Sequence, residues 1–184
     1  LGFANGNLAK FSLREGQLIW TRPIATPEGA FAIQRMIDID ADPLVFQHTI
    51  YAATYQGNIA SLDWTSGQSM WTHKISSYTG MAADQNTIYI TDAQGYLWAF
   101  NAENGTVKWQ QKQLAARILT GPAVLQNYVV VGDAQGYLHW LDKRDGHFVA
   151  REKIRPLYTA PVVQGDVVYI YTHNGYLSAY TLRN

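Results

Sequence analysis

Two aspartates separated by one residue, Asp38 and Asp40, are the residues of this chain best suited to polar recognition. They alternate with isoleucines in the stretch IDIDADP. In an extended segment, successive side chains point to opposite sides, so both carboxylates would share one face and the isoleucines the other. Such a pair can accept charge-assisted hydrogen bonds from basic or amide groups of a partner. An ordinary half-exposed strand with solvated acids explains the same spacing, and the residues alone slightly favour that simpler interpretation.

The other polar residues form no catalytic or metal-binding pattern. There is no Gly-x-Ser-x-Gly elbow, no phosphate-binding glycine-rich loop leading into a helix, and no His-Glu-x-x-His motif. Asp63, Asp142 and Asp145 fall where hairpin turns are expected, and turn capping explains them without catalysis. Trp98 and Trp140 could form an aromatic ligand platform, but packing within the sheets is the simpler role. The histidines have no metal-ligand spacing: His48, His73, His139, His147 and His173. We therefore expect no catalytic, cofactor-binding or metal-binding residues.

Composition excludes several classes of protein. The 14 basic and 14 acidic residues balance and form no run of like charge, which argues against a nucleic-acid partner or a polybasic membrane surface. No apolar stretch is long enough to span a bilayer. Cysteine is absent, which excludes disulfides and thiolate metal sites and leaves the compartment open. The opening LGFANGNL has no initiator Met, signal peptide or lipid-attachment cysteine, so we expect the chain to be a fragment that begins inside a repeat.

A repeat of about 40 residues organises the elements that must position these side chains. The letters DAQGYL occur at Asp92–Leu97 and again 41 residues later at Asp133–Leu138. Two columns of glycine lie ten residues apart in the repeat. The first column is Gly6, Gly57, Gly95, Gly136 and Gly175, and the second is Gly16, Gly67, Gly105 and Gly146. A period of this size is typical of stacked supersecondary units.

Each repeat position has a physical reason. The first glycine closes a tight turn that needs positive φ, and the alternating apolar residues after it predict a strand. An Asp or Asn then caps the next turn, which the second glycine ends. A tryptophan follows in three units, and we expect Trp20, Trp71 and Trp109 to be buried in equivalent positions, whereas Ala150 breaks the pattern. Upstream of each first turn lies another pair of short β-rich runs.

The sequence therefore predicts an all-β fold, a β-propeller built from four-stranded antiparallel blades. We expect the whole of residues 1–184 to form about half of a large ring. The first glycine interval, 51 residues, exceeds the later intervals of 38, 41 and 39, which predicts an inserted loop at about residues 21–42. Residues 111–119 are expected to be a linker between blades rather than a helix. The predicted repeat units are about 1–24, 38–75, 76–114, 120–154 and 159–184.

The pattern Gly-x-Leu-x-Ala-Leu-Asp followed by Gly-x-x-x-Trp resembles the quinoprotein-like, or PQQ-type, propeller repeat. More narrowly, the chain resembles the C-terminal half of the BamB family, lipoproteins of the outer-membrane β-barrel assembly (BAM) machinery. The resembling segments run nearly from end to end. They include ANGNLAKFSLREGQLIWTRPIA, RMIDIDADP, YQGNIASLDWTSGQSMW, ILTGPAV and VVVGDAQGYLHWLDKRDGHFVA.

This resemblance implies an eight-bladed propeller at the periplasmic face of the outer membrane, anchored through an N-terminal lipidated cysteine that this chain lacks. It implies a non-enzymatic scaffold that binds the POTRA domains of the barrel subunit BamA and assists insertion of outer-membrane proteins, with nascent outer-membrane proteins as further candidate partners. The family's acidic contact matches Asp38 and Asp40, and Arg35 beside them is a further candidate. Asp42 departs from the small polar residue that the family often has there.

Two other functions share this fold. A fragment of a PQQ-dependent dehydrogenase would need a cofactor-stacking tryptophan, calcium-binding acids and commonly adjacent cysteines; the chain has no cysteine and no such acid cluster on its expected loops. A propeller sensor domain that binds a small ligand is the other alternative, and the residues alone leave it open.

Overall fold

The computed structural model describes residues 1–24 and 38–182. These residues contain strands and connections without a helix, and so no helix capable of crossing a membrane. The contacts divide the chain into two compact units, which are described separately: Leu1–Tyr78 with Ala102–Gly105, and Thr79–Asn101 with Thr106–Asn184.

The first unit holds a two-stranded and a four-stranded sheet, in the orders β1–β2 and β3–β4–β5–β6, with every pair antiparallel. Buried side chains from both sheets form one core cluster, which includes Leu8, Trp20, Ile50 and Leu62. The strands are β1 (Asn7–Phe11), β2 (Leu18–Pro23), β3 (Leu44–Phe46), β4 (Thr49–Ala53), β5 (Gly57–Asp63) and β6 (Ser69–Ile75).

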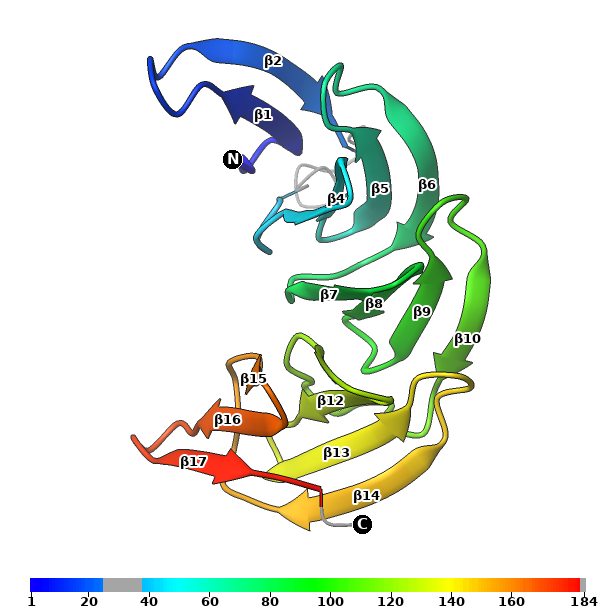
Figure 1. Cartoon of the computed structure of the whole chain (residues 1–184), viewed down its shortest axis with the longest axis vertical. Coiled ribbons are helices and arrows are strands. Elements are labelled where there is room, and N and C mark those ends of the chain that lie inside the picture. The colour runs from blue at the N-terminus through cyan, green and yellow to red at the C-terminus, as the bar shows by residue number, and fades with distance from the viewer. Residues whose placement is uncertain (25–37, 183–184) are drawn as a thin grey trace. The chain divides into compact units, whose positions relative to one another are not determined.

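The second unit holds two four-stranded antiparallel sheets and a three-stranded one, in the orders β7–β8–β9–β10, β11–β12–β13–β14 and β15–β16–β17. Figure 1 shows β12, β13 and β14 side by side, and likewise β15, β16 and β17. The strands of the first sheet are β7 (Met81–Asp84), β8 (Thr87–Thr91), β9 (Leu97–Asn101) and β10 (Val107–Gln111). The others are β11 (Ala123–Leu125), β12 (Tyr128–Gly132), β13 (Tyr137–Asp142), β14 (Phe148–Lys153), β15 (Val162–Gln164), β16 (Val167–Tyr171) and β17 (Leu177–Tyr180).

The predicted all-β class and four-stranded antiparallel blades are confirmed. The five sheets lie within the residue ranges proposed for the five repeat units. Between β10 and β11 the chain forms turns and no helix, as expected for a linker.

The repeated letters DAQGYL form the turn that leads into the third strand of a sheet. In the first copy, Oδ1 of Asp92 accepts hydrogen bonds from the backbone N–H groups of Gln94, at 2.9 Å, and Tyr96, at 2.8 Å. Gly95 then has φ of 83°, and a Cβ on it would lie 2.6 Å from the backbone oxygen of Leu114. The glycine is therefore needed both for its left-handed conformation and for the close passage of the linker.

The tryptophan column packs against the second glycine column. Within the first unit the Trp20 ring lies against Gly67, and within the second the Trp109 ring lies against Gly146, where an added Cβ would meet ring carbons at 2.7 and 2.6 Å. Trp20 and Trp109 are buried, as predicted. Trp71 makes the same contact with Gly105 and donates its indole N–H to the Ala102 carbonyl at 2.9 Å, but its side chain is only partly buried. Trp71 therefore occupies the predicted equivalent position, but the prediction that it is buried there is met only in part.

Candidate functional site

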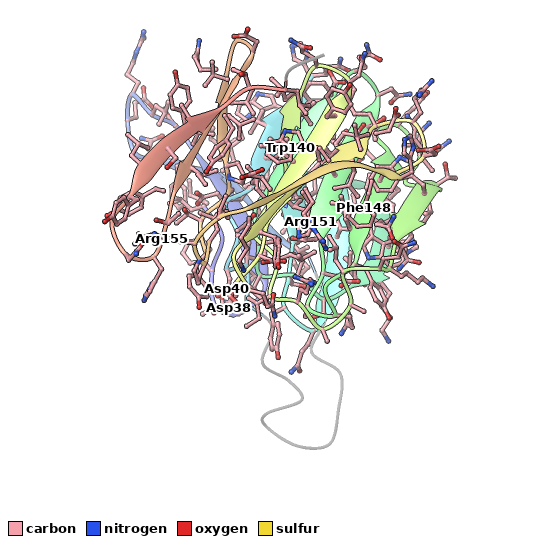
Figure 2. The ribbon with its side chains drawn as sticks, turned by 90° about the horizontal axis from the view of Figure 1, so that it is seen from below. Asp38, Asp40, Trp140, Phe148, Arg151 and Arg155 are labelled. Atoms are coloured by element: carbon pink, nitrogen blue, oxygen red, sulfur yellow. The ribbon has the colours of Figure 1, made fainter. Side chains whose placement is uncertain are left out.

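The segment that carries Asp38 and Asp40 does not belong to a sheet. Its backbone is held by a hydrogen bond from the N–H of Tyr55 to the carbonyl of Asp38, at 2.9 Å, and the strand β3 begins only at Leu44. The acids therefore do not lie in a strand, although the exposure of Asp40 agrees with the simpler interpretation that they are solvated. Figure 2 labels both acids on this segment.

Buried apolar residues fix which way the acids point. Ile39 is 7% exposed and packs in the core cluster with Leu8 and Trp20, and Ala41 is also buried. The alternating side chains behave as predicted: Asp40 and Asp42 are exposed and Asp38 is half-buried. Because Ile39 is anchored in the core, the two carboxylates are held away from it on the opposite side.

The close approach of Gly2 to Ile39 adds a second constraint on this segment. A Cβ at Gly2 would lie 2.5 Å from Cγ2 of Ile39, so this position has no room for a larger residue. Ile24, which precedes residues 25–37, lies in the same core cluster as Ile39. Both sides of the predicted insertion are thus attached to the core of the first unit. Arg35, the third predicted partner-binding residue, lies outside the described residues.

The electrostatics of the site couple its two acids. Partial desolvation of Asp40, the negative charge of Asp38 and a side-chain hydrogen bond between them raise the pKa of Asp40. A positive or hydrogen-bond-donating partner would stabilise two nearby carboxylates that repel each other. The arrangement is suited to recognising cationic or amide groups.

The described residues offer no metal site at this place or elsewhere. Within residues 1–24 and 38–182 there is no group of three or more His, Cys, Asp or Glu side chains that could hold a metal ion.

Sequence reasoning missed an aromatic pair beside these acids. Tyr55, whose backbone N–H holds Asp38, has its ring 6.4 Å from that of Tyr78, and both rings are exposed. Exposed tyrosines offer contact area at low cost in side-chain entropy and are common at interfaces. The repeat letters around Tyr55 carry no signal of this contact, because Tyr55 and Asp38 meet only through folding.

The other acids singled out in the sequence cap turns. Oδ1 of Asp63 accepts hydrogen bonds from the N–H groups of Thr65, at 3.1 Å, and Ser66, at 2.7 Å. Oδ1 of Asp142 accepts one from Arg144 at 2.8 Å, and Oδ1 of Asp145 accepts one from His147 at 3.1 Å. Turn capping is therefore confirmed.

The two tryptophans considered as a ligand platform are part of the sheets. Trp98 donates its indole N–H to Oδ2 of Asp92 at 2.7 Å and stacks on Phe100. Trp140 is buried in a core cluster of the second unit. Packing is therefore their observed role.

Comparison with known proteins places these features in a family context. The family described as outer membrane protein assembly factor BamB matches residues 1–111 and 109–184. The BamB of Alkalilimnicola ehrlichii is 38% identical over 184 residues, which cover 99% of this chain and 48% of that protein. The BamB of Legionella pneumophila is 39% identical over 179 residues, which cover 97% and 47%. The crystal structure of BamB from Moraxella catarrhalis has a TM-score of 0.92 and 29% identity, covering 99% of this chain and 55% of that one. The chain spans about half the length of the curated relatives it matches.

Proposed function

Because the chain belongs to the family of the outer membrane protein assembly factor BamB, we propose that it forms part of a non-enzymatic scaffold that assists insertion of β-barrel proteins into the outer membrane. The observation that carries this proposal is the acidic segment at Asp38 and Asp40, which the core holds with its carboxylates outward. Family membership favours this role over that of a PQQ-dependent dehydrogenase fragment with the same repeat.

The partner in this proposal is a BamA-like barrel subunit, bound through its POTRA domains. Asp38 and Asp40 accept charge-assisted hydrogen bonds from basic or amide groups of that partner, with Arg35 as a further contact residue. The exposed rings of Tyr55 and Tyr78 extend the contact beside the acids. The scaffold acts at the periplasmic face of the outer membrane, where the family's lipid anchor holds it, and nascent outer-membrane proteins are candidate further partners.

A double substitution tests this assignment. Asp38→Ala with Asp40→Ala removes both acceptors, and truncating one partner of a desolvated interfacial pair costs about 2–5 kcal/mol, or roughly 30-fold or more in affinity. We expect calorimetry with purified POTRA domains to show that loss. The melting temperature should barely change, because the carboxylates lie outside the core and surface substitutions are nearly neutral for stability.

Asp42→Ala is the matched control, since Asp42 is exposed on the same segment. Its affinity should stay within about twofold of the wild-type affinity, because a charge at the rim of an interface has little net effect on binding. Unchanged affinity of the correctly folded double variant would overturn the assignment of these acids to the interface. A large fall in its melting temperature would instead mean that the acids hold the segment in place.

A further inference from the structure

Three basic side chains gather around one tyrosine ring in the second unit. The Cζ atoms of Arg117 and Arg151 lie 5.4 and 4.9 Å from the centroid of the Tyr137 ring, and Nζ of Lys153 lies 4.0 Å from it. We call Arg117, Arg151 and Lys153 the basic cluster. Figure 2 labels Arg151, which lies on β14. The sequence contains no run of like charge, so this cluster exists only in the folded chain.

Strand pairing brings two of these cations to one face of the sheet. Lys153 is the Cα partner of Tyr137, and Arg151 is that of His139. Because alternate residues of a strand point to the same side, Arg151 and Lys153 share the face of Tyr137, and Glu152 between them points to the other. The acid of this strand is therefore directed away from the basic cluster.

The basic cluster carries more positive charge than the residues around it neutralise. Asp133 pairs with Arg117 at 2.5 Å, but among the described residues neither Arg151 nor Lys153 forms an ion pair. An aromatic ring attracts cations through its quadrupole but has no net charge, so Tyr137 does not neutralise them. Three cations this close repel one another, and an anion among them would relieve the repulsion.

The preceding sheet shows that the fold does not require this concentration of charge. Its ring at the equivalent position is Tyr96, and Lys112 lies over that ring at 5.7 Å. The strand pairing there places Gln110 at the position of Arg151. A neutral amide is therefore compatible with the same turn and the same strand pair.

Two members of the basic cluster are held in place without a ligand. Nζ of Lys153 donates to the carbonyl of Gln135 at 3.0 Å, and Arg117 is fixed by its ion pair with the buried Asp133. Both side chains still meet solvent, since Arg117 is 28% exposed and Lys153 is also exposed. Side chains that are already ordered lose less conformational freedom when a ligand binds.

A hollow of about 350 Å³ adjoins the basic cluster, between β14 and the linker that follows β10. Arg117 and Arg151 line it together with Gln113. An anion in the hollow can therefore meet both arginine side chains. The volume is at the small end of ligand pockets, which suits one charged group with a short attached chain.

We propose that the basic cluster binds a phosphate monoester, either free or as the headgroup of a lipid. Such a group carries about two negative charges at neutral pH and has three strong acceptor oxygens. Its oxygens accept hydrogen bonds from both guanidinium groups and from the ammonium of Lys153. A carboxylate brings one charge and two oxygens, so it neutralises the cluster less well. No residue of the acidic segment takes part, and the site does not depend on the proposed function.

A titration of the 184-residue chain with glycerol 3-phosphate at constant ionic strength tests the free ligand. The arginine ¹⁵Nε–¹Hε signals report the place of binding, with Arg151 assigned from Arg151→Gln. We expect saturable binding that shifts Arg151 and leaves Arg144, which pairs with Asp142, unmoved. Acetate should bind about tenfold more weakly, and Arg151→Gln should lose about tenfold in affinity for glycerol 3-phosphate, as for one charge-assisted hydrogen bond. The melting temperature of this variant should barely change, since Gln110 occupies the equivalent position.

Lys112→Gln is the matched control, because Lys112 lies over the equivalent ring of the preceding sheet. It should leave the affinity unchanged. Sedimentation with phosphatidylcholine vesicles, with and without phosphatidic acid, tests the lipid source. Binding that requires phosphatidic acid and is weakened by Arg151→Gln assigns the site to a lipid headgroup, whereas binding of glycerol 3-phosphate alone assigns it to a free ligand. The proposal is wrong if neither probe binds at millimolar concentration, if acetate binds as tightly as glycerol 3-phosphate, or if Arg151→Gln leaves binding of both probes unchanged.

Discussion

The contact between Trp109 and Gly146 constrains the hairpin between β13 and β14. The Trp109 indole donates to the Lys143 carbonyl at 2.8 Å, and its ring occupies the space where a Cβ on Gly146 would stand. Gly146 and Gly16 both have positive φ, 75° and 68°, but no atom lies within 4 Å of a Cβ at Gly16. The two positions share the conformational requirement and differ in the ring contact.

We therefore expect Gly16→Ala to cost about 1–2 kcal/mol of unfolding free energy, the strain of a left-handed residue. Gly146→Ala should cost about 1–3 kcal/mol more, because the ring must also move. Trp109→Ala should cost about 3–5 kcal/mol, as for other buried aromatic residues. Urea denaturation measures all three. Equal losses for the two glycine variants would contradict the packing role of the ring.

At the scale of the element, the hairpin that joins β13 and β14 should be sensitive to acid. The Arg144 side chain, which lies 2.8 Å from Asp142, and the Arg144 backbone N–H lower the pKa of Asp142 to about 2. A lowered pKa means that the ionised carboxylate stabilises the fold at pH above about 4, the value in unfolded chains, and that this contribution is lost as the pH falls towards 2. Asp142→Asn should therefore lower the urea midpoint at pH 6, and its difference from the wild type should shrink by pH 3.

A carboxyl ¹³C titration of the native protein provides the direct check. A midpoint for Asp142 near its ordinary value of about 3.9 would contradict the role assigned to Arg144.

At the scale of the whole molecule, the sheet edges should control association. β17 is the last strand of its sheet, and the described residues place no strand along its outer edge (Figure 1). Leu177 on that strand is 71% exposed. Unpaired strand edges with exposed apolar residues recruit further strands, and a lysine on the edge opposes this. We expect the 184-residue chain studied alone to self-associate, and Leu177→Lys to weaken that association.

Sedimentation over a range of concentrations measures the effect. A stable monomer at high concentration, with β17 amides strongly protected from hydrogen exchange, would contradict the prediction that the β17 edge recruits further strands.

Much of this structure follows from local chemistry that one sequence already contains. The glycine columns, the turn-capping aspartates and the alternating apolar residues predict the sheets and their turns, because each depends on neighbours a few residues away. The family resemblance read from the same repeats is confirmed. The outward direction of Asp40 also follows from its alternation with Ile39.

Tertiary structure decided everything that depends on distant neighbours. The hydrogen bond from the Tyr55 N–H to the Asp38 carbonyl and the partial exposure of Trp71 depend on how separate segments pack. The meeting of Arg117 with Asp133 and His139 joins a linker to a strand of the next sheet. Repeat letters predict which residues are equivalent in the chain, but burial and charge at each copy are set by side chains that folding brings from elsewhere. For that reason two copies of DAQGYL form the same aspartate-capped turn but differ in the side chain that meets the aspartate, Trp98 at Asp92 in one and His139 at Asp133 in the other.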